Sequence, residues 1–413
     1  MDKIFFHIDV NSAYLSWEAA YHLSHGGDID YREIPSIVGG DPTTRHGIVL
    51  AKSIPAKAYG VQTGESLYMA LNKCPDLLII PAHFSRYVKA SDAMVDLIAR
   101  YTDKIQRYSI DEVFTDMSIY KKDYLKVASE ISKNIKEELG FTVNIGISEN
   151  KLLAKMASDF SKPDKIHTLF KDEIESKMWP LDIGDLFMVG SRTSKKLKGR
   201  GIKTIGDLAN MDDEYIYTWL KKPGLQVLSY ARGEEFSDVH IEMDEIKSIG
   251  NSTTTPFDVT TMEDAERFIL GLSEMVGFRL RRENMCAEVI RISIKNFDFM
   301  KKRRQIKLNA PIDSTTRIFE IAMELFKEIW DGDSIRKFSV SVSDLSSNEA
   351  VQLSMFEATY EKDKNFDTCV DNIRRKYGSK EVVRSTFLYS KIEPVIGGVA
   401  EDAKEYPMMK SLL

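Results

Sequence analysis

The chain has 413 residues, a length that exceeds a single hydrophobic core and indicates roughly two to four domains. Hydrophobic residues make up 43% and charged residues 29%, and neither a membrane-spanning apolar run nor a secretory leader is visible, which favours a cytoplasmic globular protein. Three widely spaced cysteines argue against a disulfide framework or a zinc site, and the net charge of −6 means that any nucleic-acid contact must come from local basic clusters.

The first region alternates strand-like and helix-like patterns up to about residue 166. An apolar run at 4–8 predicts a buried strand that ends in the carboxylate of Asp9. A helix is expected over 11–23, and residues 35–60 are rich in Gly, Pro and short β-like runs. Further elements are expected as helices over 84–101, 124–139 and 150–160 and a strand over 141–148. The region is therefore predicted to be a mixed α+β domain.

An acidic pair, Asp111 and Glu112, lies between two β-prone segments at 105–108 and 113–117. These segments are expected to form the arms of a hairpin. With Asp9 the pair would bring three carboxylates to neighbouring strand ends, where like charges repel unless a divalent cation such as Mg²⁺ binds. The arrangement indicates two-metal phosphoryl or nucleotidyl transfer. The alternative is a solvated acidic turn beside an ordinary strand end.

From about residue 167 to 233 the chain changes to short, Lys-rich helices separated by glycines. The run 188–208 has the pattern of a helix–hairpin–helix, in which a glycine turn and basic side chains hold a phosphate. Gly190, Arg192 and Lys195 are the expected DNA contacts. The alternative is a plain helical hairpin with a Lys-rich solvent face.

An acidic, polar linker is expected at 234–245. The order strand, helix, strand, strand, helix, strand follows, which suits a small sheet with two helices on one face. The expected bounds are 251–256, 265–281, 287–295, 303–308, 317–329 and 335–345. The basic run Lys301, Lys302, Arg303 and Arg304 is a candidate contact for a DNA backbone, with a solvated turn as the alternative.

The tail from residue 346 is polar, and a helix is expected over 365–377. It contains one apolar island, which consists of Gln352, Leu353, Ser354, Met355 and Phe356. No internal repeat is visible.

Four motifs occur in the order found in the Y-family of translesion DNA polymerases, and the chain resembles the DNA polymerase IV (DinB) branch over about residues 1–356. The motifs are residues 8–14 (IDVNSAY), 109–112 (SIDE), 146–158 (GISENKLLAKMAS) with 161–163 (SKP), and the helix–hairpin–helix. The resemblance implies a multidomain α+β fold shaped like a right hand. Its parts would be a palm at 1–166 with small fingers inserted at about 25–75, a thumb at 167–233, a linker at 234–245, a βαββαβ little finger at 246–345 and a tail at 346–413.

The resemblance implies the metal ligands. Asp9 and Asp111 would bridge two Mg²⁺ ions, and Glu112 would hold the ion beside the primer 3′-hydroxyl. The carbonyl of Val10 would complete the nucleotide-side site. The two ions would activate the attacking hydroxyl and neutralise the triphosphate.

The resemblance also implies a nucleotide site. The backbone N–H groups of Asn11, Ser12 and Ala13 open a helix just after the first carboxylate, which suits the triphosphate. Tyr14 matches the family's steric gate against a 2′-hydroxyl, and the alternative for it is a core aromatic.

Lys57 and Lys162 would contact the phosphates, with Ser53 and Lys52 as further candidates. The chain departs from the family at Ile54 and Lys57, where Tyr and Arg are usual, and this implies either weaker nucleotide binding or a larger share for the neighbouring Ser53 and Lys52.

Two further departures from the family concern single positions. Asn11 stands where many relatives have a carboxylate. Met188 stands where the hairpin motif often has Gly.

The peptide at 352–356 resembles the short motif by which bacterial polymerases dock on the sliding clamp. Leu353, Met355 and Phe356 would enter an apolar pocket, and Gln352 would hydrogen-bond beside it. Such a tether raises the local concentration of the enzyme at the primer end.

The sequence thus predicts a template-directed, error-prone translesion DNA polymerase that uses dNTPs, primer–template DNA and two Mg²⁺ ions. We expect a bacterial cytoplasmic monomer that acts at the nucleoid and does not bind membranes. The main alternative is a non-catalytic DNA-binding accessory, although such proteins tend to lose the carboxylates. A nucleotide cyclase would need neither the Lys-rich hairpin nor the little finger.

Overall fold

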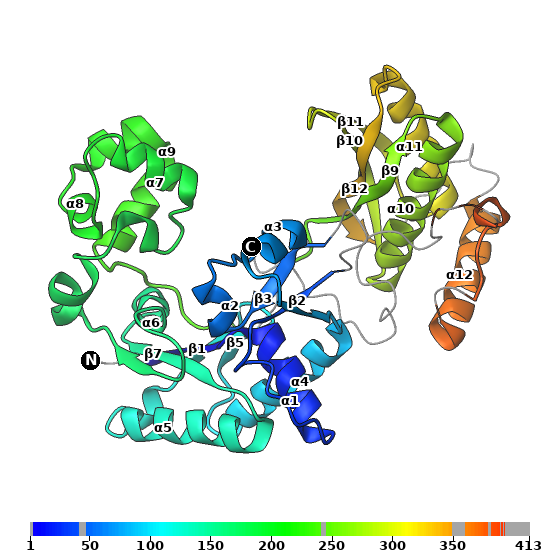
Figure 1. The fold of residues 1–413 in the computed structure, drawn as a ribbon. Helices are drawn as coiled ribbons and strands as arrows, with labels where there is room; N and C mark the ends of the chain where they lie inside the picture. Colours follow the sequence, from blue (N-terminus) through cyan, green and yellow to red (C-terminus); the bar gives the residue numbers. More distant parts are fainter. Residues whose placement is uncertain are drawn as a thin grey trace. The chain divides into compact units, whose positions relative to one another are not determined.

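The computed structural model describes residues 3–40, 47–240, 245–348, 360–378, 381–388, 390 and 392. The described chain divides into two compact units (Figure 1). One contains residues 3–39 and 48–240, and the other contains the residues from 245 onwards. Among the described residues, no helix combines the length and the apolar character that crossing a bilayer requires.

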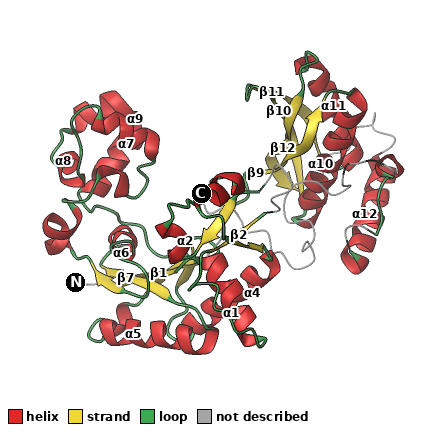
Figure 2. Ribbon diagram, viewed as in Figure 1, coloured by secondary structure: helices red, strands yellow, loops and turns green. Residues whose placement is uncertain are grey.

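A five-stranded sheet in the order β5–β6–β1–β7–β8 forms the centre of the first unit (Figure 2). Its strands are β1 (Phe5–Val10), β5 (Ile105–Arg107), β6 (Glu112–Asp116), β7 (Val143–Ser148) and β8 (Ile166–Thr168). All six residues of β1 are buried, and β1 pairs antiparallel with both β6 and β7. β5 pairs antiparallel with β6, which confirms the expected hairpin at the acidic pair, and β6 lies directly beside β1.

Helices cover this sheet. They are α1 (Ala13–Ser24), α4 (Phe84–Ile98), α5 (Tyr124–Asn134), which continues as a short π-helix (Ile135–Leu139), and α6 (Lys151–Ser158). The side chain of Asn150 caps α6 by accepting a 2.8 Å hydrogen bond from the N–H of Leu153. Helix α6 packs on β7 and β1, whereas α5 lies below the sheet in Figure 1.

A small three-stranded sheet, in the order β3–β2–β4, forms the region expected as fingers. Its elements are β2 (Ser36–Gly39), β3 (Val49–Lys52), α2 (Ile54–Ala58), α3 (Leu67–Lys73) and β4 (Leu78–Pro81). They share a separate apolar core that includes Ile37, Val49 and Leu67. The strand β4 pairs parallel with β2, so the fingers sheet extends past the predicted boundary at residue 75. The sequence could not show this, because only the pairing reveals that β4 belongs to this sheet.

The Lys-rich region is helical, with α7 (Ser191–Lys198), α8 (Ile205–Ala209) and α9 (Asp213–Ala231). Leu197, Ile205 and Val227 belong to its own apolar cluster. Helix α9 is longer than the short helices that the sequence predicts. It is kinked at Lys221, which has a φ of 59°. This residue lies two positions before Pro223, and proline disrupts the helical hydrogen bonds at such a point.

The second unit is a four-stranded sheet in the order β11–β10–β12–β9, with α10 and α11 on one face. Its elements are β9 (Ser248–Val259), α10 (Met262–Arg282), β10 (Met285–Asn296), β11 (Lys301–Ile312), α11 (Thr315–Ile329) and β12 (Ile335–Ser347). The βαββαβ order predicted from the sequence is confirmed. Side chains alternate along each strand, so one face is buried by the helices and the other is open.

A further helix, α12 (Tyr360–Tyr377), continues the second unit. The Arg281 guanidinium binds both carboxylate oxygens of Asp371, at 2.7 and 3.1 Å, and Oδ2 of Asp367 at 3.1 Å. Phe387 and Ile392 are buried in the core that α10 and α11 form with the sheet. The described part of the tail is therefore a packed portion of this unit.

Candidate active site

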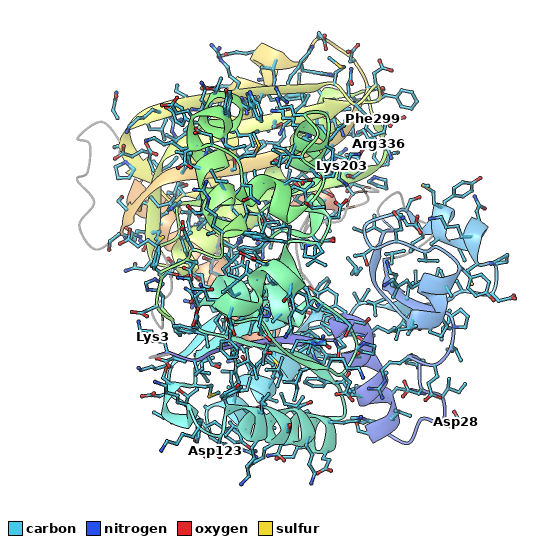
Figure 3. The ribbon with its side chains drawn as sticks, turned by 90° about the vertical axis from the view of Figure 1, so that its left-hand side faces the viewer. Lys3, Asp28, Asp123, Lys203, Phe299 and Arg336 are labelled. Carbon is cyan, nitrogen blue, oxygen red and sulfur yellow. The ribbon has the colours of Figure 1, made fainter. Side chains whose placement is uncertain are left out.

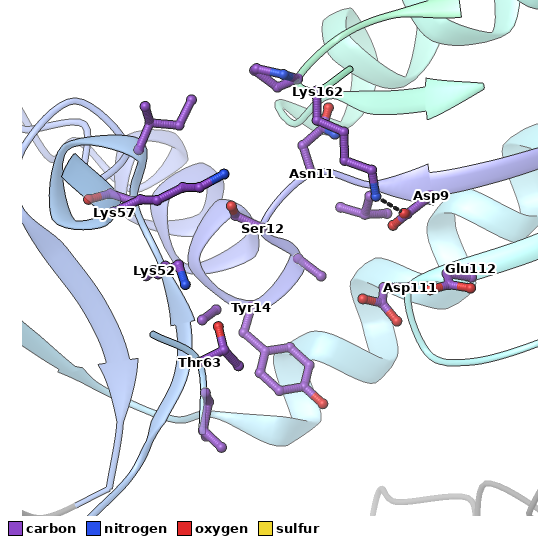
Figure 4. Close-up of a pocket in the computed structure, with 17 residues that line it drawn as sticks. Asp9, Asn11, Ser12, Tyr14, Lys52, Lys57, Thr63, Asp111, Glu112 and Lys162 are labelled. Carbon is purple, nitrogen blue, oxygen red and sulfur yellow. Dashed lines mark hydrogen bonds and ion pairs between the residues drawn. The ribbon is translucent and has the colours of Figure 1, made fainter. Parts of the chain in front are cut away.

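A pocket of about 590 Å³ lies in the first unit, where β1, the β5–β6 turn, α1 and the start of α2 meet (Figure 4). It brings together every residue that the sequence predicts for metal or nucleotide binding, namely Asp9, Val10, Asn11, Ser12, Ala13, Tyr14, Ser53, Lys57, Asp111, Glu112 and Lys162. Residues from four separate stretches of the chain thus line the same cavity.

The three carboxylates gather because β1 and β6 are paired. Asp9 lies opposite Glu112 in the ladder, and the Val10 N–H donates a 3.0 Å hydrogen bond to the Asp111 carbonyl. Burial raises the pKa of both Asp9 and Asp111, and the negative charge of Glu112 adds to the rise in each. A cluster of buried negative charge is an environment that a divalent cation stabilises.

Protein cations neutralise part of this charge. Lys162 forms an ion pair with Asp9, and Lys155 Nζ lies 3.0 Å from Glu112 Oε2. Although burial opposes it, the hydrogen bond from His7 and the charge of Lys155 lower the pKa of Glu112 to about 2. With these lysines in place, Asp9, Asp111 and Glu112 do not form a closed metal site, and no other group of three or more His, Cys, Asp or Glu side chains does so among the described residues.

Two lysines share the wall opposite the carboxylates, on the turn from β3 into α2. Burial lowers the pKa of Lys52, and the nearby charge of Lys57 lowers it further. Ser53, which lies between the two lysines in sequence, is buried. Its Oγ caps α2 by accepting a 3.0 Å hydrogen bond from the Ala56 N–H, and it accepts a second one of 3.1 Å from the Ser36 N–H. This wall carries an excess of positive charge that an anion would relieve.

Tyr14 forms the floor of the pocket. Its ring stacks on Tyr87 with centroids 4.5 Å apart and planes inclined by 11°. The Tyr87 hydroxyl donates a 2.7 Å hydrogen bond to Glu18, which fixes the supporting ring. Burial, and then the charge of Asp111, raise the pKa of the Tyr14 phenol. The ring is both part of an aromatic cluster and part of the pocket surface (Figure 4).

The start of α1 differs in one detail from the expected anion site. The Asn11 N–H already donates a 3.0 Å hydrogen bond to the Thr142 carbonyl, and the Asn11 side chain binds Thr142 and Asn144. Of the three expected backbone donors, the N–H groups of Ser12 and Ala13 are therefore the two left for the predicted anion site. Ser12 has a φ of 49°, which produces the sharp turn from β1 into the helix.

The helix–hairpin–helix is present as α7, a glycine turn and α8. Gly190 is the N-cap of α7, and a Cβ built there would have no neighbour within 4 Å among the described residues. Met188, which stands where the family often has Gly, has a φ of 69° in the left-handed region that favours glycine. Arg192 and Lys195 belong to α7, in the turns that follow its N-cap Gly190.

The open face of the sheet in the second unit is basic. Three successive rows of paired residues cross it, and they hold five cations, five hydroxyl side chains and no carboxylate. The rows are Lys301–Lys295–Lys337–Thr254, Arg303–Ser293–Ser339–Ser252 and Gln305–Arg291–Ser341–Gly250. At their edge the ring of Phe299 lies 4.5 Å from Lys295 Nζ and 5.4 Å from the guanidinium of Arg336 (Figure 3).

The four predicted basic residues of β11 divide between the two faces. Lys301 and Arg303 belong to the open face. Lys302 and Arg304 lie on the helix-covered side, where Lys302 pairs with Asp331 and Arg304 lies 2.8 Å from Glu328. The alternation of side chains along a strand produces this division.

Several residues of the site are not predicted by the sequence. Lys155 belongs to the third motif, and this position is a sequence signal that it lies near the active site. His7 precedes Asp9 by two positions on the same strand, so its side chain is on the same face as that of Asp9. Nothing in the sequence places Thr63 in the pocket. The predicted clamp-binding residues Gln352, Leu353, Met355 and Phe356 lie outside the described residues.

Comparison with known proteins gives consistent matches. The profile of the impB/mucB/samB family matches residues 8–159, and that of the family's C-terminal domain matches residues 246–355. DNA polymerase IV of Clostridium acetobutylicum is 47% identical over 391 residues, which cover 94% of this chain and 99% of that protein. DNA polymerase IV 1 of Bacillus subtilis is 35% identical over 392 residues, covering 94% and 93%.

Among solved structures, a chimaeric Y-family DNA polymerase matches with a TM-score of 0.72. The match covers 84% of this chain and all of that one, at 22% sequence identity. At this level of identity the likeness concerns the fold, and it agrees with the palm, fingers, thumb and little finger expected from the motifs.

Proposed function

Because the chain belongs to the impB/mucB/samB family, the Y-family of DNA polymerases, we propose that it is a template-directed, error-prone translesion DNA polymerase. It transfers a nucleotide from a dNTP to a primer 3′-hydroxyl. The observation that carries this proposal is the pocket in which three carboxylates face two lysines across a cavity large enough for a nucleotide.

The catalytic centre is proposed to hold two Mg²⁺ ions. Asp9 and Asp111 would hold them, with Glu112 and the Val10 carbonyl as further ligands. The buried, mutually repelling carboxyl groups fit this role, and Mg²⁺ takes few carboxylates together with substrate phosphates. When bound, the ions supply activation of the attacking hydroxyl and neutralisation of the leaving pyrophosphate.

The triphosphate is proposed to bind between the start of α1 and the lysine wall. Ser12 and Ala13 offer backbone N–H groups, and Lys52 and Lys57 offer charge. Lys162 pairs with Asp9 in this structure. We propose that the lysine moves to the triphosphate when the nucleotide binds, which releases the Asp9 carboxylate for a cation. We propose that Lys52 shares the phosphate contact with Lys57, where the family usually has an arginine.

Tyr14 is proposed as the steric gate. Its stacking on Tyr87 holds the ring at the pocket surface. Because Tyr87 packs against one face of the Tyr14 ring, the ring cannot shift to make room for a 2′-hydroxyl group. This rigidity supports selection of deoxyribose over ribose.

Primer–template DNA is proposed to contact the turn before α7 and the open face of the second sheet. Gly190, Arg192 and Lys195 would bind a phosphate at the hairpin. On the sheet, Lys301 and Arg303 are the proposed contacts, because the rows they belong to are free of carboxylates. The other two residues of the predicted basic run, Lys302 and Arg304, form surface ion pairs and are not proposed as DNA contacts.

Three further parts of the proposal concern partners and location. The peptide at 352–356 is proposed to dock on a sliding clamp. The residues on either side of the peptide, Asn348 and α12, both belong to the second unit. A clamp bound to the peptide would therefore be tethered to the second unit. We also propose that the enzyme is a monomer, and that it works in the bacterial cytoplasm at the nucleoid.

The experiment that tests the function is primer extension on an undamaged template with Mg²⁺. Asp111→Asn removes the charge at constant size and is expected to lower the rate by about a thousandfold or more, because it weakens the charge stabilisation that the ions supply. Asp103→Asn, an exposed position outside the pocket, is the matched control. No extension by the wild type at high dNTP concentration would leave the non-catalytic accessory as the better account.

A further inference from the structure

A buried histidine connects the catalytic strand to the helix behind it. His7 lies at the centre of β1 and is fully buried. Its Nδ1 is 2.8 Å from the Ser158 Oγ on α6, and its Nε2 is 3.2 Å from Glu112 Oε2 on β6. The ring thus links two residues that are far from it in sequence, and one of them is a carboxylate of the candidate active site.

The close approach of α6 depends on a glycine. Gly146 lies opposite His7 in the ladder between β1 and β7. A Cβ at Gly146 would lie 1.9 Å from the Ala154 carbonyl oxygen and 2.4 Å from the Ser158 nitrogen. The missing side chain lets the last turn of α6 reach the sheet, and this contact brings the Ser158 hydroxyl to the imidazole.

The partner of Nε2 indicates where one ring hydrogen lies. The negative Glu112 carboxylate needs a donor, so Nε2 must carry a hydrogen. The Nδ1 lies 2.8 Å from the Ser158 Oγ, a hydroxyl that can either donate or accept a hydrogen bond. The Ser158 hydroxyl has a single proton and also lies 2.8 Å from the Lys155 carbonyl. That proton can go to the Lys155 carbonyl or to Nδ1, and in either case the Nε2–H remains the group that faces Glu112.

The Glu112 carboxylate is held from one side. Its Oε2 receives both His7 Nε2 and Lys155 Nζ, at 3.2 and 3.0 Å. Within the described residues, no hydrogen bond is made to Oε1. Both donors come from the protein interior, and Glu112 lines the pocket on its other side.

We propose that His7 is a positioning residue, which with Ser158 fixes Glu112 so that Oε1 is the oxygen presented to a divalent cation. This inference rests on the proposed polymerase function and deepens it. Groups that orient a metal ligand in this way typically change metal affinity by about 10- to 100-fold when they are lost. His7 touches neither substrate nor the reacting atoms, so its effect passes through Glu112.

Two substitutions at His7 separate positioning from packing. In His7→Gln, the amide N–H can reach the place of Nε2 and donate to Glu112. In His7→Asn, the shorter amide reaches the place of Nδ1, so the contact with Ser158 remains and the donor to Glu112 is lost. Both variants replace the ring by a primary amide, which makes them a matched pair.

The primary readout is Mn²⁺ binding to the full-length protein on primer–template DNA with a 3′-dideoxy end and the next dNTP, measured by electron paramagnetic resonance. We expect His7→Asn to weaken Mn²⁺ binding by about tenfold and His7→Gln to stay close to the wild type. The Mg²⁺ concentration for half-maximal extension should shift in parallel, whereas the KM for dNTP should not. Wild-type affinity in a folded His7→Asn variant would overturn the proposal.

A second measurement needs no stable variant. Nitrogen-15 NMR of histidine-labelled wild-type protein reports the tautomer of His7. A hydrogen on Nε2 is expected, and the neutral Nδ1–H form would overturn the proposal, because it turns a lone pair towards Glu112. Neither measurement requires turnover, so a wild type that fails to extend primers would refute the polymerase function without deciding the role of His7.

Discussion

Two neighbouring arginines on β11 provide a sharp test of the proposed DNA interface. Arg303 pairs with Ser293 in the ladder and lies on the open, basic face. Arg304 pairs with Ile292, which is fully buried under the helices, and its Nε lies 2.8 Å from Glu328 on α11. Replacing either arginine by alanine removes the same side chain and the same charge, from opposite sides of one sheet.

The expected sizes of the two effects follow from counterion release. Each phosphate contact contributes about 0.9 to the slope of log K against log salt, so its loss costs about eightfold in affinity near 0.1 M salt. We expect this change in Arg303→Ala. Arg304→Ala loses an exposed ion pair worth about 0–1 kcal/mol of stability, and its salt slope should equal that of the wild type.

The assay is fluorescence anisotropy of a labelled primer–template, titrated at several salt concentrations between about 50 and 200 mM, the range over which such contacts are strongly screened. Thermal unfolding of each variant controls for loss of structure. Equal salt slopes for the two variants, or a larger change in Arg304→Ala, would refute the assignment of the open face to DNA.

Three further predictions concern other parts of the chain. Tyr14→Ala should reduce discrimination against ribonucleotides by about 10- to 100-fold, as the ratio of kcat/KM values for dNTP and rNTP, and an unchanged ratio would identify the ring as a core aromatic. Arg281→Leu should destabilise the second unit in urea unfolding by about 3–5 kcal/mol, because two buried carboxylates of α12 lose their partner. Arg317→Ala, which breaks an exposed pair, should cost about 0–1 kcal/mol, and equal losses would contradict the argument. Iodoacetamide should modify the exposed Cys369 before Cys286, since burial raises the pKa of the Cys286 thiol to about 12, and equal rates by mass spectrometry would contradict this.

Local patterns in the sequence predict much of the fold. The βαββαβ order of the second unit follows from the spacing of apolar residues, because each element buries one face against the same core. The carboxylates Asp9, Asp111 and Glu112 could be recognised because strand ends and a tight hairpin are local features. The sequence also predicts a helix over 365–377 in the tail, where α12 spans Tyr360–Tyr377.

Other features depend on contacts between distant residues. The sequence shows that Arg303 and Arg304 are adjacent, but which of them faces the helices depends on the pairing of β11 with β10. A shift of one residue would exchange the two, because successive side chains on a strand point to opposite faces.

The His7 contacts are a second example. Ser158 reaches His7 from 151 positions away, and it does so because Gly146 leaves room for α6 on the sheet. The spacing of apolar residues along the chain determines which strands and helices form, because that spacing reflects the geometry of a single strand or helix. The partners of a buried polar group are decided by how those elements pack, since only the assembled core brings the donor and the acceptor together.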